Sequence, residues 1–274
     1  MYKNHKIVVW TPAGRSKYLN ILTQYIANDP IIDEYYLCIN TQNAEDIEWM
    51  ERVSQNYNNI HIKNLPKHIK PNGNSTIGWF YNDNSDTNTI YIKIDDDIVW
   101  LEDGFFTKLV EARINNPQYL FILPNIINNA LIDHIHFRKG ILGFDKFFTY
   151  NCACNTGWKD PIFAEKKHRI LIDHILNNTL DIYRFNQWVL AGYERISINC
   201  LCYFGDEYNV SVNDEKFLTE NLTKIKQKYN CVFGDMLCSH FSFWPQAKYM
   251  DQTNLLTIYQ EIADDRFKNS NTKN

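Results

Sequence analysis

The stretch YIKIDDDIVWL, residues 91–101, decides how this sequence is interpreted. Three aspartates, Asp95, Asp96 and Asp97, stand between two apolar runs. Carboxylates this close repel one another, and a buried, unpaired one costs several kcal/mol or takes up a proton. A solvated strand end would explain one or two acidic residues. Three of them directly after an apolar strand favour a site for a cation.

The triplet follows a regular alternation of strand and helix patterns. Short β-branched runs alternate with segments whose apolar residues recur at helical spacing, a pattern typical of a parallel sheet with crossover helices. Ligands bind such sheets outside the carboxyl ends of the strands, where the triplet falls. We predict strands at residues 6–10, 31–41, 59–65 and 89–94, and helices at residues 16–30 and 44–55.

The second half of the sequence is less regular, and no linker or internal repeat divides it from the first. We therefore predict an α/β fold, with a mixed, mostly parallel sheet flanked by helices, as a single domain over residues 1–265. Residues 266–274 are expected to form a disordered tail. Further strands are predicted at residues 119–127, 195–205 and 231–244, further helices at 102–117, 164–179, 214–229 and 253–265, and a polar connection at 66–88.

Composition limits the classes of function. The 274 residues carry a net charge of −4 and no long basic run, which argues against nucleic acid as the main partner. No apolar run approaches the roughly 20 residues of a membrane span, and the first residues do not resemble a signal peptide. Seven cysteines without a secretion signal indicate reduced thiols and a cytoplasmic protein.

The chemistry of the triplet indicates which cation it would bind. Mg²⁺ and Mn²⁺ prefer carboxylate oxygens and often take only one or two ligands from the protein, with phosphates and water completing the shell. A calcium loop spreads its ligands over about twelve positions around a glycine, and this stretch lacks that spacing.

The segment IYIKIDDDIVWL, residues 90–101, resembles the DxD motif of metal-dependent glycosyltransferases with the GT-A fold. The resemblance implies that residues 1–101 bind a nucleotide sugar and that residues 102–265 bind the acceptor. It implies that Asp97 contacts Mn²⁺ or Mg²⁺ on the donor diphosphate. Asp95 would lie near the donor sugar or the metal, and Asp96 would be shared or structural.

The same resemblance implies two further roles. His240, in CSHFSFWPQ, would be another metal ligand, although alone it would be read as a buried histidine bonded to the backbone. Asp214 or Glu215, at the start of a predicted helix, would be the base that deprotonates the acceptor. An N-terminal capping pair explains those two residues equally well, and Asp206 with Glu207 is a rival pair.

Residues after the first predicted strand are candidates for binding the nucleotide. Thr11 and Pro12 lie where the GT-A fold places the base and ribose, and Arg15 could pair with a phosphate. Trp158 could stack on a sugar ring. Packing would explain Trp158 as well, and a position on the surface would explain Arg15.

The resulting prediction is an inverting, Mn²⁺- or Mg²⁺-dependent glycosyltransferase that moves a sugar from a nucleotide-diphosphate sugar, with a UDP-sugar favoured, to a hydroxyl of a glycan or other acceptor. One alternative is a sugar-phosphate nucleotidyltransferase, ranked lower because TPAGR, residues 11–15, has one Gly and one Arg where that class has a longer Gly-rich loop. Two non-catalytic alternatives are a sugar-binding module and a zinc module built from Cys152, Cys154, Cys200 and Cys202. The C-x-C spacing is not the usual one of zinc sites, and buried reduced cysteines explain these residues better.

Overall fold

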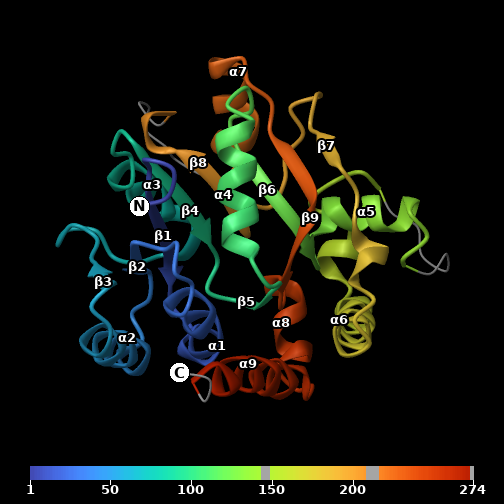
Figure 1. Ribbon diagram of the computed structural model, residues 1–274, viewed down its shortest axis with the longest axis horizontal. Helices are drawn as coiled ribbons and strands as arrows, with labels where there is room; N and C mark the ends of the chain where they lie inside the picture. Colours follow the sequence, from blue (N-terminus) through green and yellow to red (C-terminus); the bar gives the residue numbers. More distant parts are fainter. Residues whose placement is uncertain (143–148, 208–215, 272–274) are drawn as a thin grey trace.

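The computed structural model describes residues 1–142, 149–207 and 216–271. Nine strands of these residues form one sheet in the order β3-β2-β1-β4-β8-β6-β9-β5, and β7 also pairs with β9 (Figure 1). The strands are β1 (Lys6–Ala13), β2 (Glu34–Ile39), β3 (Ile60–Lys63), β4 (Thr89–Ile94), β5 (Ile98–Leu101), β6 (Ile122–Ile127), β7 (Gln187–Val189), β8 (Cys200–Phe204) and β9 (Cys231–His240). The predicted α/β fold with a mixed sheet in one domain is confirmed.

The sheet has a parallel half and a mixed half. Strands β3, β2, β1 and β4 pair in parallel, as the alternation of patterns predicts. Beyond β4 the pairing changes, because β8 is antiparallel to both β4 and β6, while β9 is parallel to β6 and antiparallel to β5 and β7. Strand β4 is buried at every position, which explains why its residues are mostly apolar.

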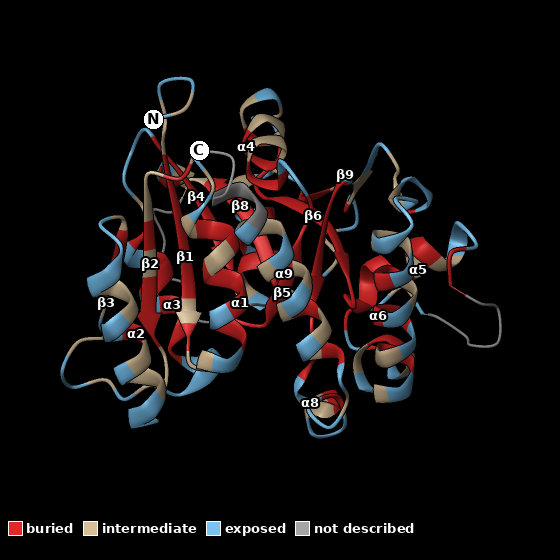
Figure 2. Cartoon of the chain, turned by 60° about the horizontal axis from the view of Figure 1, so that its bottom comes forward, coloured by how far each residue is buried: buried red, intermediate tan, exposed pale blue. Residues whose placement is uncertain are grey.

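Helices cover the sheet and leave their polar faces in solvent. Figure 2 shows buried strands at the centre and exposed outer faces on the helices. Helix α4 packs on β6, β8 and β9, and α9 packs on α1 and β5 (Figure 1). The helices are α1 (Ser16–Ala27), α2 (Ala44–Asn56), α3 (Ile77–Asp83), α4 (Phe105–Asn115), α5 (Ala130–Arg138), α6 (Pro161–Leu176), α7 (Thr223–Lys226), α8 (Trp244–Met250) and α9 (Leu255–Asn271).

Several elements differ from the prediction. The connection at residues 66–88 contains α3, whose IGWF sequence buries Ile77 and Phe80, and β5 follows the aspartates directly. Helices α5 and α8 were not predicted. Helix α9 continues to Asn271, so much of the predicted disordered tail is helical; the Arg266 side chain donates to the Leu101 carbonyl oxygen at 2.8 Å.

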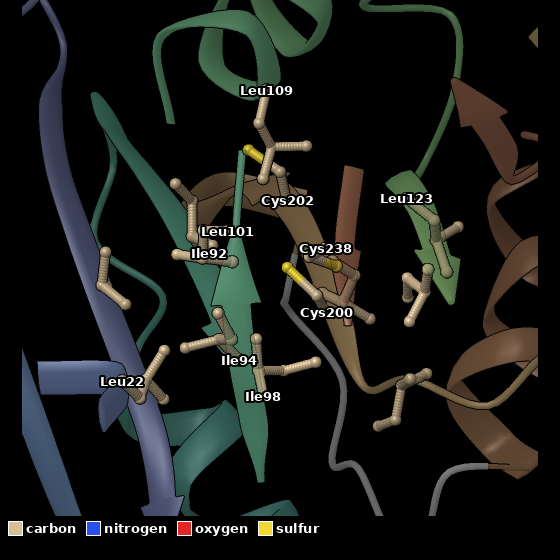
Figure 3. Packing of buried hydrophobic residues seen from close by; sticks show 14 of the residues in the cluster. Leu22, Ile92, Ile94, Ile98, Leu101, Leu109, Leu123, Cys200, Cys202 and Cys238 are labelled. Atoms are coloured by element: carbon tan, nitrogen blue, oxygen red, sulfur yellow. The ribbon is translucent and has the colours of Figure 1, made fainter. Parts of the chain in front are cut away.

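The cysteines and aliphatic residues share one core. Figure 3 shows Cys200, Cys202 and Cys238 among aliphatic side chains of the neighbouring strands. All seven cysteines are free thiols, and burial raises the pKa of Cys200 and Cys202. Among the described residues, no group of three or more His, Cys, Asp or Glu side chains is arranged to hold a metal ion. The zinc module is therefore not supported.

Two buried histidines predict acid sensitivity. His168 Nε2 donates to the Phe241 carbonyl oxygen (2.9 Å), so Nδ1 accepts from the Tyr259 hydroxyl (2.8 Å) and the ring is neutral. His136 donates from Nε2 to Asn125 Oδ1 (2.7 Å). Burial, reinforced by the nearby charge of Lys167, lowers the pKa of both histidines to about 3.

A pKa below the unfolded value means that the unfolded chain binds the proton first. We expect each histidine to cost about 1.4 kcal/mol of unfolding free energy per pH unit, beginning below the unfolded pKa of about 6.5 and continuing towards pH 3. Urea unfolding at pH 7, 6, 5 and 4 would measure it. The variant His168→Gln, although less stable at pH 7, should show a shallower fall. Equal slopes for the two proteins would contradict the assignment.

Candidate functional site

The aspartates lie at the point where the order of the parallel strands reverses. From β1 the chain continues to β2 and β3 on one side, and then returns to place β4 on the other side of β1. The crevice at the carboxyl ends of two such strands is the usual ligand site of an open α/β sheet. Gly14 and Arg15 follow β1 there, and Asp95, Asp96 and Asp97 follow β4. The predicted position of the triplet is confirmed.

Strand pairing brings His240 to the triplet. Strand β5 begins one residue after Asp97, and Ile98 at its start pairs with His240 at the end of β9. The Phe241 amide donates to the Asp97 carbonyl oxygen at 2.8 Å, which fixes the two segments against each other. Two residues far apart in the sequence therefore meet because their strands are antiparallel neighbours.

Arg15 joins two of the three aspartates. Asp96 accepts hydrogen bonds from the Gly14 amide (3.0 Å) and from Arg15 Nε (3.1 Å). The same guanidinium lies 2.9 Å from Asp97 Oδ2. The Arg15 side chain is 43% exposed to solvent. Asp96 and Asp97 are almost completely buried. In the crevice, the partly exposed Arg15 guanidinium therefore lies between the carboxylates of Asp96 and Asp97.

Asp95 is held by a different cation. The Lys93 ammonium, which is fully buried, pairs with Asp95 Oδ1 and donates to the Ile198 carbonyl oxygen at 2.7 Å. Asn199 Nδ2 donates to Asp95 Oδ2 at 3.2 Å. Both oxygens of Asp95 thus have protein partners. The structure favours a role for Asp95 in fixing the loop over its predicted role as metal ligand.

His240 presents a nitrogen lone pair to Asp97. A carbonyl oxygen only accepts, so His240 Nδ1, at 3.1 Å from the Asn128 carbonyl oxygen, must carry a proton. In the neutral ring, Nε2 is then unprotonated, and it lies 3.3 Å from Asp97 Oδ2. Two lone-pair atoms at this distance need a cation between them, either a proton or a metal ion.

The charges around Asp97 favour its ionised form. Burial raises the pKa of Asp97, but the charges of Arg15 and then His240 outweigh burial and hold it below its usual range. Burial lowers the pKa of His240, and Asp97 reverses this and raises it. For Asp96, burial outweighs Arg15 and the pKa is raised. In the absence of a metal, an ionised Asp97 faces a ring that readily holds a second proton.

The pair of Asp97 and His240 fits a divalent cation. Asp97 Oδ1 is a buried oxygen without a hydrogen-bond partner among the described residues. His240 donates from its other ring nitrogen to a carbonyl oxygen, as metal-binding histidines commonly do. Two protein ligands are fewer than the three of a self-contained site. They are the number that Mg²⁺ or Mn²⁺ takes when phosphates and water supply the other ligands.

A cavity of about 800 Å³ opens over these residues. The chain contributes to it from both halves of the sheet, with the aspartates at the junction. Its lining includes Pro12, Gly14, Arg15, Asn40, Thr41, Asn74 and Ile77 from the N-terminal half and Cys152, Trp158, Arg195, Ser197, Asn199, His240, Ser242, Phe243, Trp244 and Ala247 from the C-terminal half.

The remaining predicted site residues divide into three groups. Pro12 and Trp158 line the cavity, whereas Thr11 is fully buried, with its hydroxyl oxygen accepting from Tyr35 at 3.1 Å, and is corrected to a structural residue. Asp214 and Glu215 lie outside the described residues. The rival pair Asp206 and Glu207 is not among the described residues that line the cavity, and Glu207 pairs with Lys228 at 2.5 Å.

Sequence reasoning missed the residues that support the site. Lys93 could have been found, because a lysine inside the apolar run TIYIKI has to pair when buried. Asn128 has a positive φ of 63°, which lets its carbonyl oxygen meet His240. Gln246 accepts from Asn128 Nδ2 at 3.0 Å. Nothing in the local sequence indicates these last two contacts.

Comparisons with solved structures show likenesses at low identity. One is to 2-C-methyl-D-erythritol 4-phosphate cytidylyltransferase of Francisella tularensis, with 12% identity, a TM-score of 0.33, and coverage of 44% of this chain and 57% of that one. Another is to 4-diphosphocytidyl-2C-methyl-D-erythritol synthase, with 9% identity, a TM-score of 0.31, and coverage of 43% and 59%. The matches span less than two thirds of both enzymes.

A third likeness covers nearly the whole chain. CMP:2-keto-3-deoxy-manno-octonic acid synthetase, solved as a complex with CTP, matches with 10% identity and a TM-score of 0.47 over 95% of this chain and 99% of that one. No protein-family description matches the sequence, and no curated protein does. Among the described helices, none has the length and apolar character needed to cross a bilayer.

These findings correct the function predicted from the sequence. The likenesses are to a cytidylyltransferase and two synthases of cytidine-linked products, and they contradict the prediction of a glycosyltransferase. A sugar-phosphate nucleotidyltransferase is the alternative that the sequence leaves open. The strand order places the acidic loop at this crevice whichever reaction is performed.

Proposed function

We propose that this chain transfers a nucleotidyl group from a nucleoside triphosphate to a sugar phosphate, with a divalent cation. The observation that carries the proposal is the partly exposed Arg15 guanidinium, bridging Asp96 and Asp97 at the crevice between β1 and β4. A nucleoside triphosphate with its bound cation carries a partner for each side of this ion pair: the cation for the carboxylate, and a phosphate for the guanidinium. The cation would replace the guanidinium at Asp97, and the guanidinium would turn to a phosphate.

Arg15 suits this exchange for two reasons. Its guanidinium forms paired, charge-assisted hydrogen bonds to phosphate as readily as to carboxylate. Its position directly after β1 keeps the side chain inside the cavity in either arrangement. Asp97 and His240 would hold the cation, which when bound supplies neutralisation of phosphate charge.

The transfer itself needs few protein groups. An oxygen of the sugar phosphate forms a bond to the α-phosphorus, and the bond from that phosphorus to the bridging oxygen of the leaving pyrophosphate breaks. The bridging oxygen keeps the electron pair. The attacking phosphate is already ionised at neutral pH, since its second pKa is about 6, so it requires no base. What the chain supplies is position and positive charge, from Arg15 and the cation held at Asp97 and His240.

The cavity accommodates two substrates. Its volume of about 800 Å³ lies in the upper part of the range of roughly 300–1,000 Å³ found for ligand sites. The N-terminal wall includes Thr41 and Asn74, whose hydroxyl and amide groups suit a base and ribose, while the Asn40 amide is bonded to Gly73 and Thr76. The C-terminal wall is then free for the second substrate.

Release of pyrophosphate tests the proposal. The protein would be mixed with each common nucleoside triphosphate, with Mg²⁺ or Mn²⁺, and with a panel of hexose 1-phosphates. We expect at least one pair to release pyrophosphate in a reaction that stops when the sugar phosphate or the cation is omitted. Arg15→Met should reduce the rate at least about tenfold. Consumption of a nucleotide-diphosphate sugar without pyrophosphate formation from any pair would contradict the proposal.

A further inference from the structure

Three aromatic side chains, Trp158, Phe243 and Trp244, line the C-terminal wall of the cavity. Trp244 begins α8 and is 89% exposed, although it lines the cavity. Single exposed apolar residues are common, but this one adjoins Phe243 and shares the wall with Trp158. The Phe243 ring centroid lies 4.6 Å from that of His240 and 6.5 Å from that of Trp158. Aromatic rings thus extend from the predicted metal ligand towards solvent.

One buried glutamine fixes this wall. Gln246 is fully buried, and its Oε1 accepts from the Phe243 amide at 3.0 Å. Its Nε2 donates to the Gly157 carbonyl oxygen at 3.1 Å. The same side chain therefore holds the residue before Trp158 and the residue before Trp244. The backbone beside each tryptophan is thus held in place without the help of a ligand, which lowers the ordering cost of binding.

An arginine adds positive charge to the same wall. Along residues 195–199, Arg195, Ser197 and Asn199 line the cavity, while Ile196 and Ile198 between them are buried. Arg195 is exposed and has no ion pair or hydrogen bond with any described residue. Asn199 at the other end of this segment reaches Asp95. Residues 195–199 thus connect the aspartate triplet, which Asn199 contacts, to Arg195, whose charge is not paired with any carboxylate among the described residues.

We infer that this wall is the binding site of the sugar phosphate, with its ring against Trp244 and its phosphate towards Arg195. This rests on the proposed function and identifies which wall takes the second substrate. A sugar ring has a face of C–H groups that packs against an indole, and a phosphate pairs with a guanidinium. The arginine also offsets the repulsion between the two anionic substrates as they meet at the triplet.

Binding of hexose 1-phosphates, measured by tryptophan fluorescence without nucleotide, tests the inference. We expect at least one of them to bind about tenfold more tightly than inorganic phosphate or the neutral hexose. Trp244→Ala should weaken that binding at least about tenfold. Arg195→Met should reduce it to the affinity of the neutral sugar, and Arg195→Lys should retain part of it. Trp79→Ala, which removes a half-exposed tryptophan outside the lining, serves as the matched control.

The outcomes separate this inference from the proposed function. Unchanged affinity in Trp244→Ala, or no binding of any hexose 1-phosphate, would overturn the inference even if pyrophosphate is released. Tight binding that depends on Trp244 and Arg195, in a protein that releases no pyrophosphate, would support this site and contradict the transferase. Both variants should keep the wild-type rise in melting temperature with nucleoside triphosphate and Mn²⁺, because their side chains lie on the other wall.

Discussion

Asp97→Asn will lose the metal-dependent binding of nucleotide and at least about 99% of the transfer activity. The substitution keeps the size of the side chain but replaces the buried Oδ1 or Oδ2 by a nitrogen that cannot bind a cation. It also removes the negative charge that pairs with Arg15 and His240. Loss of one electrostatic partner of the transition state commonly costs about 10²–10³-fold in rate.

Thermal unfolding measures the loss of nucleotide binding in Asp97→Asn separately from the loss of transfer activity. A nucleoside triphosphate at about 100 times its Kd, with Mn²⁺, should add ~2.7 kcal/mol to the wild type, or roughly 5 °C in melting temperature. Asp97→Asn should show no such increase. Asp103→Asn, at a side chain that is 89% exposed and pairs with Arg266, should behave as the wild type. If Asp97→Asn retained both the shift and the activity, the cation would have to bind elsewhere.

Lys167→Met will destabilise the fold by about 3–5 kcal/mol. Lys167 Nζ lies 2.6 Å from Asp133 Oδ2, and both side chains are almost completely buried. Removing the lysine leaves a carboxylate without its counter-ion in the interior, and a cost of this size is usual for such a change. Since domains are commonly stable by only 5–15 kcal/mol, a large part of the total would be lost. Urea unfolding at pH 7 measures the difference.

The pH dependence of that loss identifies its cause. In the wild type, burial raises the pKa of Asp133 and the charge of Lys167 opposes it. Without Lys167, the pKa of Asp133 in the folded protein rises further above the unfolded value. A carboxyl group with a raised folded pKa stabilises the fold as the pH falls, so the penalty should be smaller at pH 5 than at pH 7. A penalty independent of pH would point to lost packing instead.

A double variant provides the matched control. Asp133→Leu together with Lys167→Met removes both charges, and replacement of a whole buried ion pair by apolar groups is often close to neutral. We expect the double variant to be more stable than Lys167→Met alone. A double variant as unstable as the single one would show that the pair also supports its surroundings, such as the Gly157 carbonyl oxygen at 3.5 Å from Lys167 Nζ.

The sequence predicted the part of the fold that depends on local patterns. The strand and helix periodicity of the first hundred residues was enough for β1 to β4 and for α1 and α2, and this half contains the crevice. The triplet and Arg15 therefore could be placed. His240 could be proposed only through a family resemblance, because its position depends on the pairing of Ile98 with β9, a contact between distant segments.

Further parts of the site had no local signal. The wall formed by Trp158 and Trp244 depends on hydrogen bonds of Gln246 to residues 157 and 243, and α8 is only seven residues long. Thr11 was placed in the site because it follows the first apolar run, but β1 continues to Ala13 and buries it. Strand ends are hard to predict, and here the strand runs three residues beyond its predicted end, so a residue expected in a loop lies in the buried strand.

The position of β9 in the sheet has a consequence for how the chain acquires its structure during synthesis. Strands β5, β6 and β7 all pair with this late segment, whereas β1, β2 and β3 pair only within the first four strands, and β4 pairs with β1 and β8. At about 5–20 residues per second, the ribosome makes His240 on the order of ten seconds after Asp97. During that interval the first half can form while β5 and β6 lack β9, the neighbour that they share. Newly made chains should therefore depend on chaperones until β9 emerges, and a chain that ends before residue 231 should aggregate.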